Sequence, residues 1–173
     1  PTADQDNHHM NWGTATASRT GVIAADLKES SVLDALAARR VYASEDVNAK
    51  LLVSQVSGSD RHLMGETVSV TSPTTKVEIA YYDPDGTDRT AKVRLYYYRA
   101  SDSLFTATST INSAYHTVAF DAENRITLPA ADAADRSAND LIPVKSGEIL
   151  SLDLPLTSGV QWVFAEIVQG GDL

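Results

Sequence analysis

The chain of 173 residues contains no cysteine and few basic residues, and both shortages narrow what it can do. Without thiols it has no disulfide, no cysteine nucleophile and no thiolate ligand for a metal, although the cellular compartment stays open. Its 14 Lys and Arg face 23 Asp and Glu, which gives a formal net charge of -9. This charge repels nucleic acid and anionic lipid, so we expect neither nucleic acid nor a membrane as a partner.

Long apolar runs and the common catalytic motifs are also missing from the sequence. No run approaches the roughly 18 to 20 residues that span a bilayer, and the first residues lack the basic and apolar regions of a signal peptide. The sequence has no G-x-S-x-G elbow, Walker loop, G-x-G-x-x-G turn or H-E-x-x-H helix. This argues against the common serine hydrolases, nucleotide-binding enzymes and zincins.

One helix is predicted near the N-terminus, after a polar loop and a short strand at Thr20–Ala24. The segment Lys28–Arg40 is rich in Ala and Leu, and one side of it carries Val32, Leu33 and Leu36. Ser30 or Ser31, together with Asp34, would cap its first turn. The two arginines at its end suit the negative C-terminal pole of a helix.

After residue 48 the apolar period falls from about 3.6 to 2, which predicts β-strands. The expected strands are Lys50–Val56, Thr67–Thr71, Lys76–Tyr82, Lys92–Arg99, Tyr115–Phe120, Arg125–Leu128, Glu148–Leu154 and Gln161–Gln169. Turn signals separate them at residues 57–60, 83–86, 145–147 and 157–159, and a connecting loop is expected at 130–140. Short strands at this spacing favour an antiparallel β-sandwich, with Val93, Leu95, Val163, Ala165 and Ile167 facing inward.

A carboxylate and an imidazole lie one residue apart in the run Asp6-Asn7-His8, and both can reach a single metal ion. An active metal centre needs three or four protein ligands and an open position for water. Almost no other cluster of potential ligands stands in the chain. The pair therefore suggests part of a metal site, and this chain would be the tail of an enzyme.

The order of several motifs resembles the C-terminal part of metal-dependent hydrolases of the polymerase and histidinol phosphatase (PHP) superfamily, in particular the CehA/McbA-like branch. The motifs are DNHHMNWG, SRTGVIA, LDALAARRVYASEDVN, LLVSQV and MGETV, and they cover roughly Asp4 to Gly65. In that branch the last catalytic motif is a D-x-H pair, followed by the RTG strand, a helix and an appended sandwich of immunoglobulin-like type. The resemblance implies that Asp6 and His8 are metal ligands.

The resemblance also implies the organisation of the chain. Residues 1–48 would be the remnant of a distorted (β/α) barrel, and residues 49–173 an immunoglobulin-like antiparallel β-sandwich. The parent would hold divalent zinc, manganese or iron and act on a small-molecule ester or phosphoester, with the missing N-terminal catalytic domain as the partner of this chain. The earlier His-x-His and acidic motifs are absent here. We therefore expect no tightly bound metal and no activity from this chain alone.

Trp12 and Arg19 are candidate substrate-binding residues, because an aromatic plane can stack on a leaving group and a guanidinium can grip a phosphate or carboxylate. The alternatives are that Trp12 packs against the barrel or the sandwich, and that Arg19 fixes loop carbonyls or pairs with Asp26 or Asp46.

Two further features have structural alternatives that we favour. The run from Asp83 to Asp88 departs from the calcium-loop pattern and is interpreted as a hairpin turn. The tyrosines at 81, 82 and 96–98 would form a sugar-binding platform only if they shared one face, and strand alternation divides them. Two function classes stay open: a metallohydrolase remnant with an accessory sandwich, and a non-catalytic β-sandwich that binds a partner or a glycan.

Overall fold

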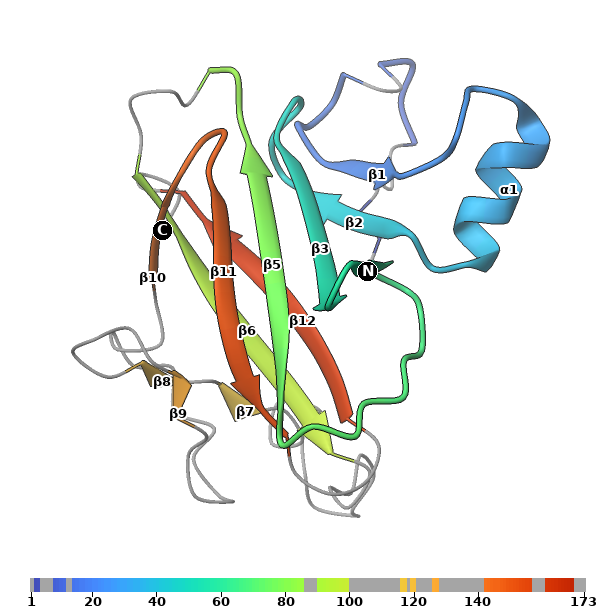
Figure 1. The fold of residues 1–173 in the computed structure, drawn as a ribbon. Helices are drawn as coiled ribbons and strands as arrows, with labels where there is room; N and C mark the ends of the chain where they lie inside the picture. Colours follow the sequence, from blue (N-terminus) through green and yellow to red (C-terminus); the bar gives the residue numbers. More distant parts are fainter. Residues whose placement is uncertain are drawn as a thin grey trace, which may run out of the picture.

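The computed structural model describes residues 2–3, 8–11, 14–85, 90–99, 116–117, 119–120, 126–127, 142–156 and 161–169 (Figure 1). In these residues the chain forms one helix and twelve strands. They are β1 (Arg19–Val22), α1 (Glu29–Ala37), β2 (Val41–Ser44), β3 (Lys50–Ser57), β4 (Asp60–Leu63), β5 (Thr74–Tyr82), β6 (Thr90–Arg99), β7 (His116–Thr117), β8 (Ala119–Phe120), β9 (Ile126–Thr127), β10 (Ile142–Lys145), β11 (Ile149–Pro155) and β12 (Gln161–Val168).

Two four-stranded antiparallel sheets make up the body of the molecule. The first has the order β11-β5-β3-β4, and the second has the order β10-β6-β12 with β7 also paired to β6. In Figure 1, β5 and β11 lie in front of β6 and β12. Smaller antiparallel pairs are formed by β1 with β2 and by β8 with β9. The sequence prediction of a mainly β, antiparallel sandwich is confirmed.

The core lies between the two large sheets and follows from strand alternation. On β5 the buried and more exposed residues alternate, so that Val77, Ile79 and Tyr81 point inward. They meet Val93 and Leu95 of β6, which are fully buried. From β12, the side chains of Val163, Ala165 and Ile167 pack on the same cluster. The five inward-facing residues predicted from the sequence are therefore confirmed.

Two of the predicted turns carry glycines that the backbone requires. Gly58 has φ +62° in the two-residue turn between β3 and β4, and Gly147 has φ +84° in the turn that carries the chain from β10 in one sheet to β11 in the other. Residues with a Cβ adopt such angles at a cost, so glycine fits both positions. The predicted turn at 157–159 and the loop at 130–140 lie outside the described residues.

The strand predictions were wrong at four places. Residues 67–71 belong to no strand in the described part of the chain, although their Thr and Val content favours one. The strands β2, β4 and β10 were missed. The signal of the preceding helix hid β2, the predicted turn at 57–60 proved two residues shorter and hid the start of β4, and Pro143 weakened the signal of β10. Beside these, β7, β8 and β9 lie within the two strands predicted at 115–120 and 125–128.

The helix is shorter than predicted, and its caps differ. It begins at Glu29 behind an N-cap at Lys28 that makes no side-chain capping bond, so the predicted serine and Asp34 caps are wrong. Instead, Asp26 Oδ1 accepts a hydrogen bond from the Lys28 N–H at 3.1 Å. The helix stops at Ala37 because Arg39 turns into the left-handed region at φ +59°. No helix in the described residues has the length and apolar character that crossing a membrane requires.

Candidate functional site

The residues proposed as a metal and substrate site lie at the N-terminal end, and the structure describes two of the four. Asp6 and Trp12 fall outside the described residues. His8 is exposed. Arg19 donates from Nη1 to the carbonyl oxygens of Thr16 at 3.0 Å and Ser18 at 2.7 Å. The guanidinium thus fixes loop carbonyls, which is the structural alternative stated for this residue.

The R-T-G motif, Arg19 to Gly21, holds the segment before the D-x-H pair onto β1. The Thr20 hydroxyl accepts a hydrogen bond from Ala3 N at 3.0 Å and donates one to Ala3 O at 2.7 Å. Gly21 lies opposite Tyr42 of β2, and a Cβ at position 21 would meet the Tyr42 ring at 2.1 Å. Only glycine therefore lets the ring lie across β1, where the Tyr42 hydroxyl donates to Ala49 O at 3.2 Å.

In the described residues, no group of three or more His, Asp and Glu side chains gathers in a way that would hold a metal. His8 therefore belongs to no such group of three among the described residues, and its proposed partner Asp6 stands outside that search. The donor set that the sequence offers is one carboxylate and one imidazole. Such a set suits zinc, manganese or iron but supplies only part of a coordination sphere.

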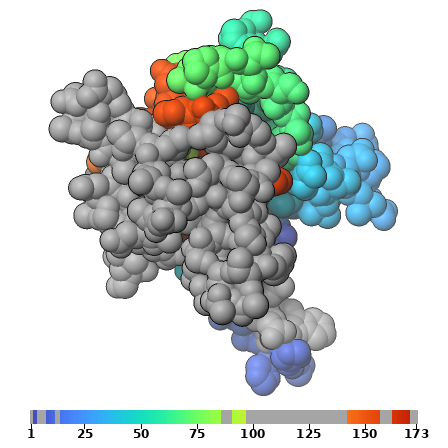
Figure 2. Space-filling view, turned by 90° about the horizontal axis from the view of Figure 1, so that it is seen from below, coloured from blue at the N-terminus to red at the C-terminus, as the bar shows by residue number. Residues whose placement is uncertain are grey.

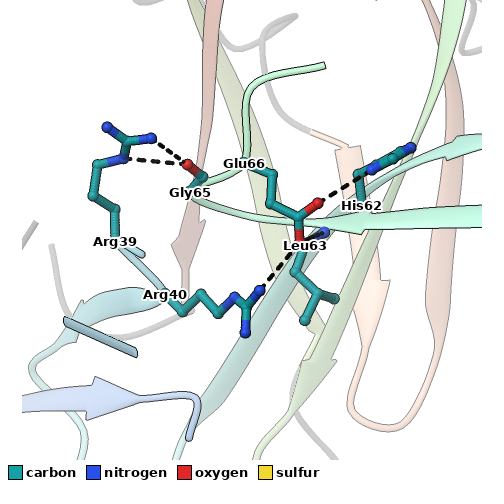
Figure 3. Close-up of polar contacts among 6 residues, drawn as sticks. All are labelled: Arg39, Arg40, His62, Leu63, Gly65 and Glu66. Atoms are coloured by element: carbon teal, nitrogen blue, oxygen red, sulfur yellow. Dashed lines mark hydrogen bonds and ion pairs between the residues drawn. The ribbon is translucent and has the colours of Figure 1, made fainter. Parts of the chain in front are cut away.

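A second polar cluster joins the end of α1 to the sandwich, and we call it the junction: Arg39, Arg40, His62, Gly65 and Glu66 (Figure 3). The Arg39 side chain donates to Gly65 O from Nε at 3.2 Å and from Nη2 at 2.7 Å. The Glu66 carboxylate lies 3.4 Å from Arg40 Nη2 and 3.1 Å from His62 Nδ1, and it forms polar contacts with both. Two segments 26 residues apart in the sequence are thereby held together.

The pKa of Glu66 and the backbone conformation of Gly65 both reflect their contacts in this junction. The hydrogen bond with the His62 ring, and next the bond from the Leu63 N–H at 3.3 Å, hold the pKa of the Glu66 carboxyl below its usual value. The Arg40 charge acts in the same direction. Gly65 has φ +96°, and a Cβ there would lie 2.0 Å from Ala38 O. The sequence signal for this contact was the glycine of the M-G-E-T-V motif, but its partner was not predictable.

The segment 14–48, which we call the N-terminal unit, leaves apolar side chains in solvent. In α1 the side chain of Ala35 is buried, whereas Leu33 is 55% exposed. Leu27, just before the helix, is fully exposed. Leu36 and Val47 are exposed as well. Figure 2 shows the blue N-terminal unit projecting beside green and orange segments of the sandwich. The sandwich covers one side of this unit and leaves the apolar outer side of α1 uncovered.

Asp83, which follows the C-terminal end of β5, carries a buried carboxylate that the sequence reasoning missed. Asp83 is 2% exposed, and its Oδ2 accepts hydrogen bonds from Gln169 Nε2 at 2.7 Å and from the Tyr81 hydroxyl at 3.2 Å. The Ser146 hydroxyl donates to Asp83 O at 2.8 Å, and the Asp85 N–H donates to Asp83 Oδ1 at 2.9 Å. Asp83 therefore ties β5, the β10–β11 turn and the end of β12 together, whereas residues 86–88 of the predicted hairpin turn lie outside the described residues.

Comparison with known proteins gives no relative for this arrangement. No model of a protein family matches the chain, and neither a curated protein nor a solved structure matches it.

Proposed function

We propose that this chain is the C-terminal part of a metal-dependent hydrolase that acts on phosphoesters or related esters, with the sandwich as an accessory domain. In this proposal Asp6 and His8 are two ligands of a divalent-metal site that the missing N-terminal catalytic domain completes. Trp12 and Arg19 would lie beside that site. The isolated chain would be inactive, because its own ligands leave the metal sphere incomplete.

The observation that carries the proposal is the uncovered apolar side of the N-terminal unit. A two-stranded sheet such as β1–β2 is marginal by itself, and exposed leucines on a short helix lose the stabilisation that burial provides. Leu33 and Leu36 of α1, and Leu27 just before it, are exposed although Arg39 bonds the end of this helix to Gly65. A further domain that covers these residues would complete a core that the sandwich leaves open.

The junction connects the N-terminal unit to the sandwich. It holds α1 and β2 at a fixed place on the sandwich, and Thr20 fixes the chain just before the D-x-H pair. The D-x-H pair thus follows shortly after a residue, Ala3, that is bonded to β1. This would let the sandwich position the two ligands against a catalytic domain.

A bound divalent ion would supply a hydroxide at neutral pH by lowering the pKa of its water. Asp6 would contribute a carboxylate oxygen and His8 an imidazole nitrogen, and neither would act as the nucleophile. Arg19 donates from Nη1 to the carbonyl oxygens of Thr16 and Ser18. A role for Arg19 toward substrate would therefore be to shape the loop that carries the ligands.

The test is a phosphoesterase assay on the complete product of the gene, with p-nitrophenyl phosphate and added manganese or zinc. We expect Asp6→Ala and His8→Ala to lower turnover by more than about 100-fold, since second-shell substitutions alone cost about 10- to 100-fold. His9→Ala is the matched control, because it removes an adjacent exposed imidazole and should keep most of the turnover. An inactive gene product, or equal loss in all three variants, would overturn the proposal.

A further inference from the structure

The outer face of the β10-β6-β12 sheet carries a strip of aromatic side chains that the hydrolase proposal does not use. Trp162 is 52% exposed and Phe164 is 40% exposed. On β12, Val163, Ala165 and Ile167 pack into the core, so the even-numbered residues between them face outward. We call Trp162 and Phe164, together with Tyr96, which is only 7% exposed, and with Arg94 and Glu166 beside them, the aromatic strip.

The strip is ordered by contacts between β12 and β6. Phe164 and Tyr96 are direct cross-strand partners, and their rings stack with centroids 4.7 Å apart and an interplanar angle of 11°. One step along the strands, Arg94 Nη1 donates to Glu166 Oε2 at 3.0 Å. The Tyr96 hydroxyl donates to the same oxygen at 2.7 Å. The stacked pair therefore ends in a hydrogen-bonded polar group, and the residues from 162 to 166 span about 13 Å of one strand.

We propose that the aromatic strip binds a neutral glycan, with sugar rings stacked on Trp162 and Phe164 and their hydroxyls bonded to the polar group at Glu166. Exposed aromatic rings favour a ligand with flat C–H faces, and an adjacent acceptor favours a ligand with hydroxyls. Carbohydrates combine both properties. Glu166 keeps 41% of its side chain exposed and has acceptor capacity beyond its two bonds.

Charge and size argue against other occupants. The Arg94–Glu166 pair is neutral as a unit, and the chain has a net charge of -9, so an anionic polymer gains no attraction from either. A stable protein interface covers about 800 Å² on each partner. Two exposed rings on one strand form a much smaller surface, whereas a short run of sugar rings matches a 13 Å strip, taking about 3.3 Å per strand residue.

The test is affinity electrophoresis of the whole chain in native gels that each contain one neutral polysaccharide: hydroxyethyl cellulose, xylan, galactomannan or glycogen. We expect slower migration in at least one gel, and at least tenfold weaker retardation for Trp162→Ala. Tyr82→Ala is the matched control, because Tyr82 is 46% exposed on the other large sheet, and it should migrate like the parent chain. Circular dichroism of each variant establishes that the fold is kept.

A second measurement reports on the strip itself. The chain has two tryptophans, so Trp12→Phe leaves Trp162 as the sole indole fluorophore, and the polysaccharide that slows migration should shift its emission. Unslowed migration in all four gels would overturn the proposal, as would retardation that Trp162→Ala leaves unchanged. Self-association that Trp162→Ala abolishes, without any retardation, would also overturn it by identifying a second copy as the occupant.

Discussion

Replacing Gly65 with alanine tests the junction between the N-terminal unit and the sandwich. Gly65 has φ +96°, and an added Cβ would lie 2.0 Å from Ala38 O and 2.9 Å from Arg39 C. Both neighbours are backbone atoms, so no side-chain rotation relieves the overlap. The substitution must therefore move the turn at residues 64–65 away from the end of α1.

The expected size of the effect follows from two costs. A left-handed backbone costs a residue with a Cβ about 1–2 kcal/mol. Displacing the turn also loses the Arg39 hydrogen bonds to Gly65 O, and net hydrogen bonds contribute about 0.5–1.5 kcal/mol each. We expect the free energy of unfolding to fall by about 2–5 kcal/mol, which for a chain of this size lowers the melting temperature by roughly 4 to 20 °C.

The assay is urea unfolding followed by circular dichroism, with Gly58→Ala as the matched control. Gly58 has φ +62°, and its Cβ would meet nothing within 4 Å, so only the conformational cost of about 1–2 kcal/mol applies. Hydrogen exchange should also become faster in α1 of Gly65→Ala and stay unchanged there in the control. Equal destabilisation by the two substitutions would refute the backbone contact at residue 65.

Three further outcomes follow from the contacts described. The lowered pKa of Glu66 means that its contacts stabilise the folded state fully above the ordinary value of 4.5 and that this contribution is lost as the pH falls through the lowered pKa. Glu66→Gln should therefore flatten the acid side of a stability–pH curve, and an unchanged curve would contradict this. Asp83→Ala should lower the free energy of unfolding by about 1–3 kcal/mol, because the Gln169 amide loses a buried acceptor, whereas Asp153→Asn on the exposed surface should change it by less than about 0.5 kcal/mol. Hydrogen exchange should be fast at residues 8–11 and slow in β6 and β12, and slow exchange at 8–11 without metal would favour a structural role for the D-x-H segment.

The strands of the sandwich were predictable where one face is buried along a long strand. In β5, β6, β11 and β12 every second residue packs into the core and is apolar, so the sequence alternates with a period of two residues and predicts a strand. In β10 only four residues pair, and Pro143 counts against a strand although its neighbours Ile142 and Val144 are buried. The segment 67–71 shows the opposite case, because high β-propensity forms no ladder without a partner strand.

The polar contacts were harder to predict because their partners are distant in the sequence. Arg39 reaches Gly65 across 26 residues, and Asp83 reaches Gln169 across 86 residues. Composition and period give no information on such pairs. The role of Arg19 as a brace for loop carbonyls was within reach, because its partners Thr16 and Ser18 are local. The ligand roles of Asp6 and His8 remain a prediction from the motif.

The central claim is that Asp6 and His8 belong to a metal site that a further domain completes, and metal content tests it most directly. The complete gene product and this 173-residue chain would be purified without chelator and measured by inductively coupled plasma mass spectrometry. We predict zinc, manganese or iron bound to the complete product, lost from its Asp6→Ala/His8→Ala variant, and removed from the isolated chain by dialysis. Metal that stays in the double variant, or that the isolated chain retains as firmly as the complete product, would contradict the claim.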